Sequence, residues 1–193
     1  MRLRSLSTVG VILLACTALA GCASGAGTAD PGTGPAPIAT SESTAPSAGE
    51  AAALAQAQAW LDAANLPPGA VRVEKSPVRF TSGTGWPCGP YKDLVGYWMV
   101  PGMTVVDAAN WLAQNPTADL ITTLPAPVSE EWGPVDSATV GYIPTVGAQE
   151  GVVYTLAKMD ADVAIRAVVA AQTDTATCPP LPDGSMYGAP GQG

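Results

Sequence analysis

The chain has 193 residues, of which 47% are hydrophobic, and it carries a formal charge of −8 with no histidine. This length supports one hydrophobic core of ordinary size. Eight basic residues are too few for the clustered Lys and Arg that nucleic-acid binding needs, and the lack of histidine excludes Ser-His and Cys-His catalytic pairs.

Residues 1–21 have the features of an export signal. Arg2 and Arg4 form a cationic start, and the apolar run over residues 9–20 is shorter than the roughly 20 residues that a bilayer core requires. The run closes with Leu19-Ala20-Gly21-Cys22, which resembles the lipobox of bacterial prolipoproteins. The resemblance implies that Cys22 receives a diacylglyceryl group and becomes the N-terminus of a protein held at the outer face of the cell membrane.

A second interpretation of this segment stays open. Ala18-Leu19-Ala20 fits the small-x-small rule of ordinary signal peptidase, which would release a soluble secreted protein. We favour lipidation, because it also explains a cysteine placed just past the apolar run and the flexible chain behind it. Anionic headgroups would repel such an acidic chain, so its attachment to the membrane would have to be covalent.

Residues 22–49 are expected to form the lipidated cysteine and a flexible linker. The stretch is rich in Ala, Gly, Ser, Thr and Pro, and Asp30 and Glu42 are its only charged residues. It has too little apolar surface to offset the entropy lost on ordering. As a random coil it would span roughly 30 Å, enough to hold a folded domain clear of the membrane.

A first helix is predicted over residues 48–64. Ser47 and Glu50 resemble a capping box at its start, and the segment after residue 66 contains two prolines and a glycine that end it. Four apolar residues are expected on its buried face: Leu54, Ala57, Trp60 and Leu61. Alternating Val71, Arg72, Val73 and Glu74 then predict a short strand.

A strand, a turn and a second helix are predicted between residues 95 and 116. The β-prone run over 96–100 is followed by Pro101-Gly102, and Thr104 can cap a helix. Its buried face should hold Val105, Ala108, Ala109 and Leu112. The YWMVPG run with the later Trp-Leu and Pro resembles a stretch of uncharacterised secreted actinobacterial proteins, loosely over residues 60–173. The resemblance implies a secreted location and no particular activity.

The second half of the chain predicts strands. Residues 138–142 alternate, and the runs over 151–159 and 163–172 should form an antiparallel hairpin around residues 160–162. The predicted fold class is α+β, with two helices packed on one face of a largely antiparallel sheet. One globular domain should occupy residues 50–182, followed by a flexible tail over 183–193.

Cys88 and Cys178 are expected to form a disulfide bond. Cys16 would leave with the signal peptide and Cys22 would be acylated, so these two thiols would remain in an oxidising compartment. A redox-active pair is the alternative, but the spacing is not CxxC. We therefore expect a structural bond.

Four aromatic residues surround Cys88 in the sequence: Trp86, Tyr91, Tyr97 and Trp98. Aromatic rings in a loop rich in Gly and Pro can form a surface that binds sugars or peptides. The alternative is core packing, which we favour because a domain with a single Phe must use Trp and Tyr in its core. As a ligand surface, these four residues remain the best candidate that the sequence offers.

Two classes of function stay open. The first is a non-enzymatic envelope lipoprotein that binds a cell-wall component or another envelope protein. The second is a cell-wall-modifying hydrolase that uses a carboxylate pair. We expect no cofactor and no metal, because Asp160 with Asp162, or Glu130 with Glu131, supply too few oxygens for calcium. The sequence favours binding, since it contains no activated nucleophile.

Overall fold

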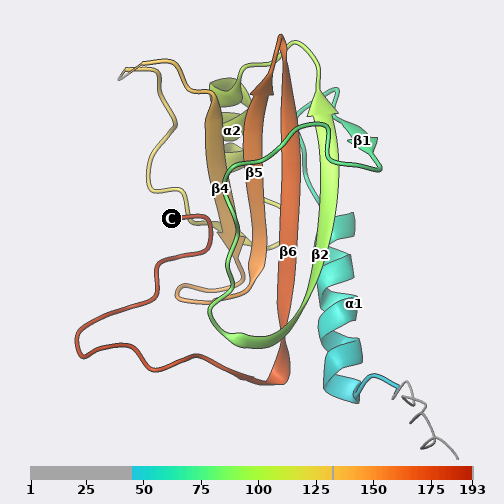
Figure 1. The fold of residues 1–193 in the computed structure, drawn as a ribbon, viewed down its shortest axis with the longest axis vertical. Coiled ribbons are helices and arrows are strands. Elements are labelled where there is room, and N and C mark those ends of the chain that lie inside the picture. The colour runs from blue at the N-terminus through green and yellow to red at the C-terminus, as the bar shows by residue number, and fades with distance from the viewer. Residues whose placement is uncertain (1–44, 132, 193) are drawn as a thin grey trace, which may run out of the picture. The chain divides into compact units, whose positions relative to one another are not determined.

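The computed structural model describes residues 45–131 and 133–192. They form an α+β domain in which six strands make one antiparallel sheet, in the order β1-β2-β6-β5-β4-β3. Two helices cover one face of this sheet, so the predicted fold class is confirmed (Figure 1). The predicted signal peptide, Cys22 and most of the predicted linker lie outside the described residues.

The helices and strands follow one another along the chain with short connections except between β1 and β2 and between β3 and β4. Their bounds are α1 (Ala48–Asp62), β1 (Val71–Val73), β2 (Gly89–Val100), α2 (Val105–Gln114), β3 (Ile121–Thr122), β4 (Ser137–Ile143), β5 (Gly151–Met159) and β6 (Asp162–Thr177).

Helix α1 begins with the predicted capping box, in which the Ser47 and Glu50 side chains each accept a hydrogen bond from the other's backbone N–H. The prediction of Leu54 on the buried face was wrong, because its side chain is 46% exposed and Ala53 is buried instead. The other three predicted residues, Ala57, Trp60 and Leu61, are buried. Helix α2 is capped by Thr104 and buries the four residues predicted for it.

The two long strands extend beyond their predicted bounds. Strand β2 starts at Gly89 rather than near residue 96, and its register with β6 runs from Gly89 opposite Thr177 to Val100 opposite Val163. The early part of β2 contains Gly, Pro, Lys and Asp, which have low strand propensity. Pairing with the central strand β6 therefore holds this segment extended where local preference does not.

The predicted hairpin between β5 and β6 is confirmed. Met159 pairs with Asp162, which leaves Asp160 and Ala161 as a two-residue turn. Asp160 has φ 51, a left-handed conformation that Asp tolerates better than most residues do. The turn sets the register of the two central strands.

Alternate residues of the sheet face opposite sides, and only one side is covered by helices. The core under α1 and α2 includes Trp98, Tyr142, Tyr154, Ile165 and Val169. Figure 1 looks onto the other side, which is crossed by the loop between β1 and β2, while the chain after β6 runs below the sheet and returns beside β4. We call this side the helix-free face.

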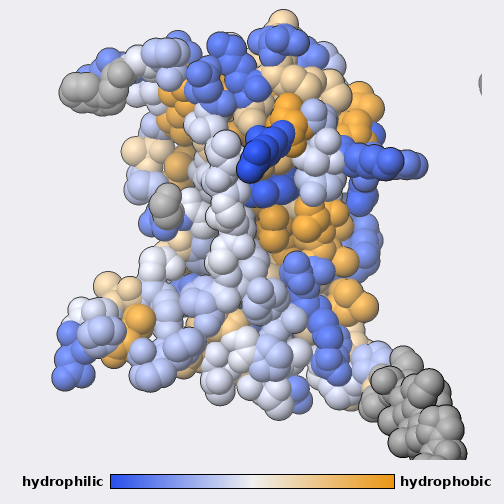
Figure 2. All heavy atoms as spheres, in the orientation of Figure 1, coloured by the Kyte–Doolittle hydropathy of each residue, from blue (hydrophilic) through white to orange (hydrophobic). Residues whose placement is uncertain are grey.

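The helix-free face changes in polarity across its width. Figure 2 shows a pale band of weakly hydrophilic residues where the crossing loop runs over the sheet, beside an apolar patch over β2 and β6. The patch includes Val95, which is 43% exposed, and the partly buried Val168 opposite it. The pale band marks the place where a pocket opens.

Candidate functional site

The four aromatic residues singled out in the sequence do not form one surface. Trp98 lies on the helix side of β2 and is 6% exposed, while Trp86 is 8% exposed and packs against Val153 and Ala170 on the helix-free face. The sheet thus separates the two tryptophans. Core packing, which we favoured from the sequence over a ligand surface, therefore holds for both tryptophans, because both rings are part of the hydrophobic core.

The two tyrosines of this group share the helix-free face of β2. Tyr97 is partly buried and its ring stacks on Phe80 with centroids 6.4 Å apart. Tyr91 is 36% exposed and lies opposite Gln172 of β6. Only Tyr91 therefore keeps an exposed ring.

Cys88 and Cys178 lie at disulfide distance, 90 positions apart in the sequence. Cys88 directly precedes β2 and Cys178 directly follows β6, next to the pair Gly89 and Thr177. The bond therefore closes one end of the β2–β6 ladder. It also fixes the points at which the crossing loop enters the sheet and the C-terminal chain leaves it.

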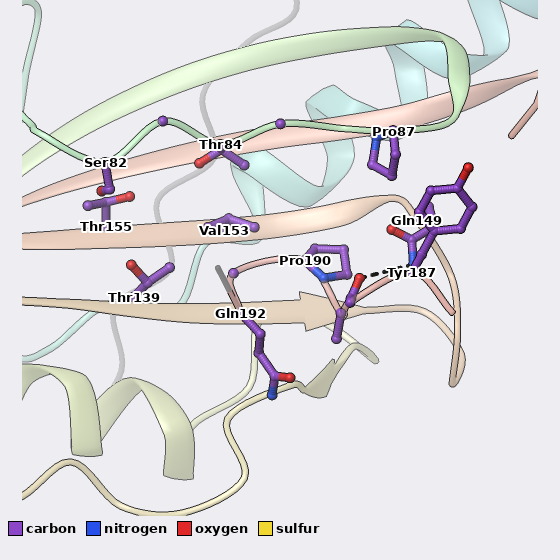
Figure 3. Close-up of a pocket in the computed structure, with 15 residues that line it drawn as sticks. Ser82, Thr84, Pro87, Thr139, Gln149, Val153, Thr155, Tyr187, Pro190 and Gln192 are labelled. Atoms are coloured by element: carbon purple, nitrogen blue, oxygen red, sulfur yellow. Dashed lines mark hydrogen bonds between the residues drawn. The ribbon is translucent and has the colours of Figure 1, made fainter. Parts of the chain in front are cut away.

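A pocket of about 450 Å³ opens on the helix-free face (Figure 3). Its floor consists of Thr139 on β4 and Val153 and Thr155 on β5. Residues 82–87 of the crossing loop form one wall, and residues 187–192 near the C-terminus form the other. We call this cavity the polar pocket.

The loop wall is held by Arg166, which projects from the helix-free face of β6. Its Nη2 donates to the backbone oxygen of Ser82 and to Oγ1 of Thr155, at 2.6 and 3.2 Å. The guanidinium also lies 5.0 Å from the ring centroid of Phe80. Together with the buried Trp86, these contacts fix the loop over the floor of the pocket.

The other wall is held by hydrogen bonds from side chains to backbone carbonyl groups. Thr123 Oγ1 donates to Pro190 O at 2.9 Å, Gln149 Nε2 donates to Gly188 O at 3.3 Å, and Gln192 donates to Thr123 O. Residues 183–193 were expected to form a flexible tail, but residues 187–192 pack against the sheet. The sequence did not predict this packing, because a segment rich in Gly and Pro has no apolar periodicity.

Gly141 on β4 makes this packing possible. A Cβ atom at this position would lie 2.0 Å from the backbone oxygen of Pro190 and 2.5 Å from Thr123 Oγ1. Such distances are far below van der Waals contact, so any larger residue would push the wall away. Gly141 is therefore required by a close approach of two backbones.

The lining of the polar pocket is divided into two ends (Figure 3). Hydroxyl groups gather at one end, from Ser82, Thr84, Thr139 and Thr155, and rings gather at the other, from Pro87, Tyr187 and Pro190. Among the described residues, none that lines the pocket carries a charge. The arrangement suits a small, neutral ligand with hydrogen-bonding groups on one part and apolar faces on another.

Carboxylates gather elsewhere, in a smaller pocket of about 190 Å³ beside the β5–β6 turn. Its acidic residues are Glu130, Asp136, Asp160 and Asp162. Asp136 pairs with Lys158 at 3.3 Å, and Asp162 accepts a hydrogen bond from the N–H of Gly102 at 3.1 Å. Over residues 45–131 and 133–192, no group of three potential ligands is close enough to hold a metal ion.

Sequence reasoning missed the polar pocket. Ser, Thr and Gly are common in strands and loops, and the residues of the pocket come from four segments far apart in the chain. No protein-family model, curated protein or solved structure matches this chain. Within the described part of the chain, no helix has the length and apolar character needed to cross a membrane.

Proposed function

We propose that the protein is a lipid-anchored, extracytoplasmic binding protein whose domain takes a small, uncharged ligand in the polar pocket. Cys22 would carry the anchor, and the segment that follows it would tether the domain at the outer face of the membrane. The ligand would be a component of the cell envelope. The role of the domain is binding and not turnover.

The observation that carries this proposal is the lining of the polar pocket. Its volume of about 450 Å³ falls within the roughly 300–1,000 Å³ of small-molecule sites. Side chains of Ser, Thr and Gln can each donate and accept hydrogen bonds, so they suit a polar ligand without charge. A charged ligand would lose its hydration there without gaining an opposite charge.

A wall-modifying hydrolase would need two carboxylates, about 5–9.5 Å apart, that flank a bound sugar. Carboxylates gather in the smaller pocket, but there the side chain of Asp136 is 72% exposed and pairs with Lys158. An exposed, paired carboxylate lacks the enclosed setting that such catalysis uses. We therefore favour binding in the polar pocket.

Nuclear magnetic resonance tests the location of the site. We would titrate the full-length, ¹⁵N-labelled protein in a non-glycosidic detergent with uncharged polar fragments, namely methyl glycosides, capped dipeptides and small amides. Amide signals of Ser82, Thr139, Thr155 and Gly191 should shift together, because these residues line one cavity.

A blocking variant and a matched control sharpen this test. Thr139→Trp places a large ring on the floor of the pocket and should abolish the shifts, whereas Thr177→Trp lies on β6 outside the lining and should preserve them. The thermal midpoint of both variants shows whether they are folded. If no fragment shifts these signals, or if Thr139→Trp binds like the wild type, the polar pocket is not the site.

A further inference from the structure

We propose that the ligand of the polar pocket is a neutral saccharide of one or two sugar units. This inference rests on the proposed function and goes further by choosing the chemical class of the ligand. Four features of the pocket support it. They are the lack of charge in the lining, the arrangement of hydroxyl groups, the cluster of rings, and a floor strand whose backbone hydrogen bonds are made within the sheet.

The first feature is the lack of charge in the lining. Arg166 is not among the residues that line the pocket, and its Nη2 donates to Ser82 O and to Thr155 Oγ1. The acidic residues of the smaller pocket lie on another set of segments. A uronic acid, an amino acid or a phosphorylated sugar would therefore find no charged side chain in the lining with which to pair.

The second feature is the hydroxyl end. Ser82 and Thr84 descend from the loop, and Thr155 and Thr139 rise from the floor toward them (Figure 3). Thr155 Oγ1 already accepts a hydrogen bond from Arg166, so its own hydrogen is free to donate to a ligand. Arg166 is thus a positioning residue that sets which way one floor hydroxyl donates. A ligand with several hydroxyl groups matches this mixed set of donors and acceptors.

The third feature is the ring end, where Pro87, Pro190 and Tyr187 lie on the side of Val153 away from Ser82 and Thr139 (Figure 3). A pyranose ring has hydroxyl groups at its edge and C–H groups on its faces. Its edge can bond to the threonines while a face packs against these rings. The pocket thus offers hydroxyl groups to the polar edge of a sugar ring and apolar rings to its C–H face.

The fourth feature argues against a peptide. The floor strand β5 is paired with β4 on one side and with β6 on the other over most of its length. Its backbone groups are therefore used within the sheet, and an extended peptide could not add to it as a further strand. A peptide would have to bind through side chains, for which the pocket offers no deep apolar cavity.

Calorimetry on the full-length protein in the same non-glycosidic detergent tests the class of ligand. The probes are the methyl glycosides of glucose, galactose, mannose and N-acetylglucosamine with their β-linked dimers, methyl glucuronide, and acetylated, amidated dipeptides of Ala, Ser and Gly. We expect at least one neutral glycoside to bind, methyl glucuronide to bind at least about tenfold more weakly, and the peptides to show no binding.

Variants at each end of the pocket test the geometry. Thr139→Val keeps the shape of the side chain and removes the hydroxyl, and should weaken glycoside binding by about three- to tenfold; Thr139→Ser should restore it. Tyr187→Ala should weaken binding by at least a similar factor, and Tyr187→Phe, which keeps the ring and loses only the hydrogen bond to Pro179 O, should weaken it less. Thr177→Val, outside the pocket, is the control.

Each outcome has a defined meaning. Binding of the capped peptides without any glycoside overturns the saccharide assignment and leaves the binding site in place. Equal binding of the glucuronide and the neutral glycosides overturns the argument from charge. Glycoside binding that is unchanged in both Thr139→Val and Tyr187→Ala shows that the sugar binds elsewhere. If the fragments, peptides and glycosides all fail to bind, the proposed function itself is wrong.

Discussion

The core of the domain contains polar groups that are paired with one another. Tyr154 and Thr117 share a hydrogen bond of 2.7 Å, and Thr117 Oγ1 also accepts one from the N–H of Asn65. Tyr142 packs edge-on against Tyr154 and donates to Leu112 O. Burial raises the pKa of Tyr154 to about 12, and it also raises the pKa of Tyr142. These hydroxyl groups therefore join α2 and the segment after it to the sheet.

Tyr154→Phe should lower the free energy of unfolding by about 1–3 kcal/mol at neutral pH, because the buried Thr117 hydroxyl loses a partner. The pKa of Tyr154 is higher in the folded state than its ordinary value of 10.0. Its contribution is therefore complete below pH 10 and is lost as the pH rises toward 12. Urea denaturation should show that the difference between wild type and variant narrows above pH 10.

The exposed Tyr91→Phe is the matched control and should change stability little at any of these pH values. A difference between wild type and Tyr154→Phe that stays constant or widens from neutral pH to about pH 11 would contradict the assignment of Tyr154 as a buried, pKa-shifted tyrosine.

At the scale of elements, the polar pocket depends on two irregular segments and one covalent bond. The loop wall runs directly into Cys88, and the chain that forms the other wall starts at Cys178. Regular elements supply only the floor. Since β5 and β6 pair along their lengths while the walls rely on a few side-chain bonds, the walls should open at lower free energy than the floor.

Replacing both cysteines, as Cys88→Ser with Cys178→Ser, should lower the free energy of unfolding by about 2–5 kcal/mol, since the bond limits the unfolded chain. Hydrogen exchange should increase first in residues 82–87 and 187–192 and least in β5 and β6. Mass spectrometry of peptides from the deuterated protein measures the exchange in the two wall segments and in the two central strands.

The reduced wild type serves as the second sample in this experiment, and it should behave like the double variant. Exchange that increases equally in the walls and in the central strands would show that the bond supports the whole sheet and not the pocket walls in particular.

At the scale of the whole molecule, the protein combines a domain with a predicted N-terminal anchor outside the described residues. The domain is acidic, so association with an anionic membrane through charge is unfavourable. A diacylglyceryl group would attach the protein to the membrane despite this charge. Each CH₂ group buried in the bilayer contributes about 0.8 kcal/mol, so two acyl chains anchor a protein stably. The anchor would keep the polar pocket close to the cell envelope from which we expect its ligand.

Cells that express the wild type should incorporate an alkyne-labelled fatty acid into the protein, and Cys22→Ala should abolish this label. Cys16→Ala is the matched control, because that residue would be removed with the signal peptide, and it should keep the label. A wild type without label, or a labelled Cys22→Ala variant, would contradict lipidation at Cys22.

The sequence by itself determined the elements whose signals are local. The capping residues Ser47 and Thr104, the apolar spacing of α2 and the β5–β6 turn act over a few neighbouring residues, so a linear pattern contains them. The disulfide was also predictable, because counting the thiols that would remain after the predicted processing gives only one pair. These features were sufficient for the fold class.

Only the tertiary structure decided which face each side chain occupies and what lies over the helix-free face. Trp86 lies just before β2 and Trp98 lies within it, yet the sheet separates the two side chains. The polar pocket combines β4, β5, the crossing loop and residues 187–192, and the hydrogen bond from Arg166 on β6 to Ser82 in the loop spans 84 positions of the chain. The wall near the C-terminus also depends on the close approach of Pro190 to Gly141, which no local pattern encodes.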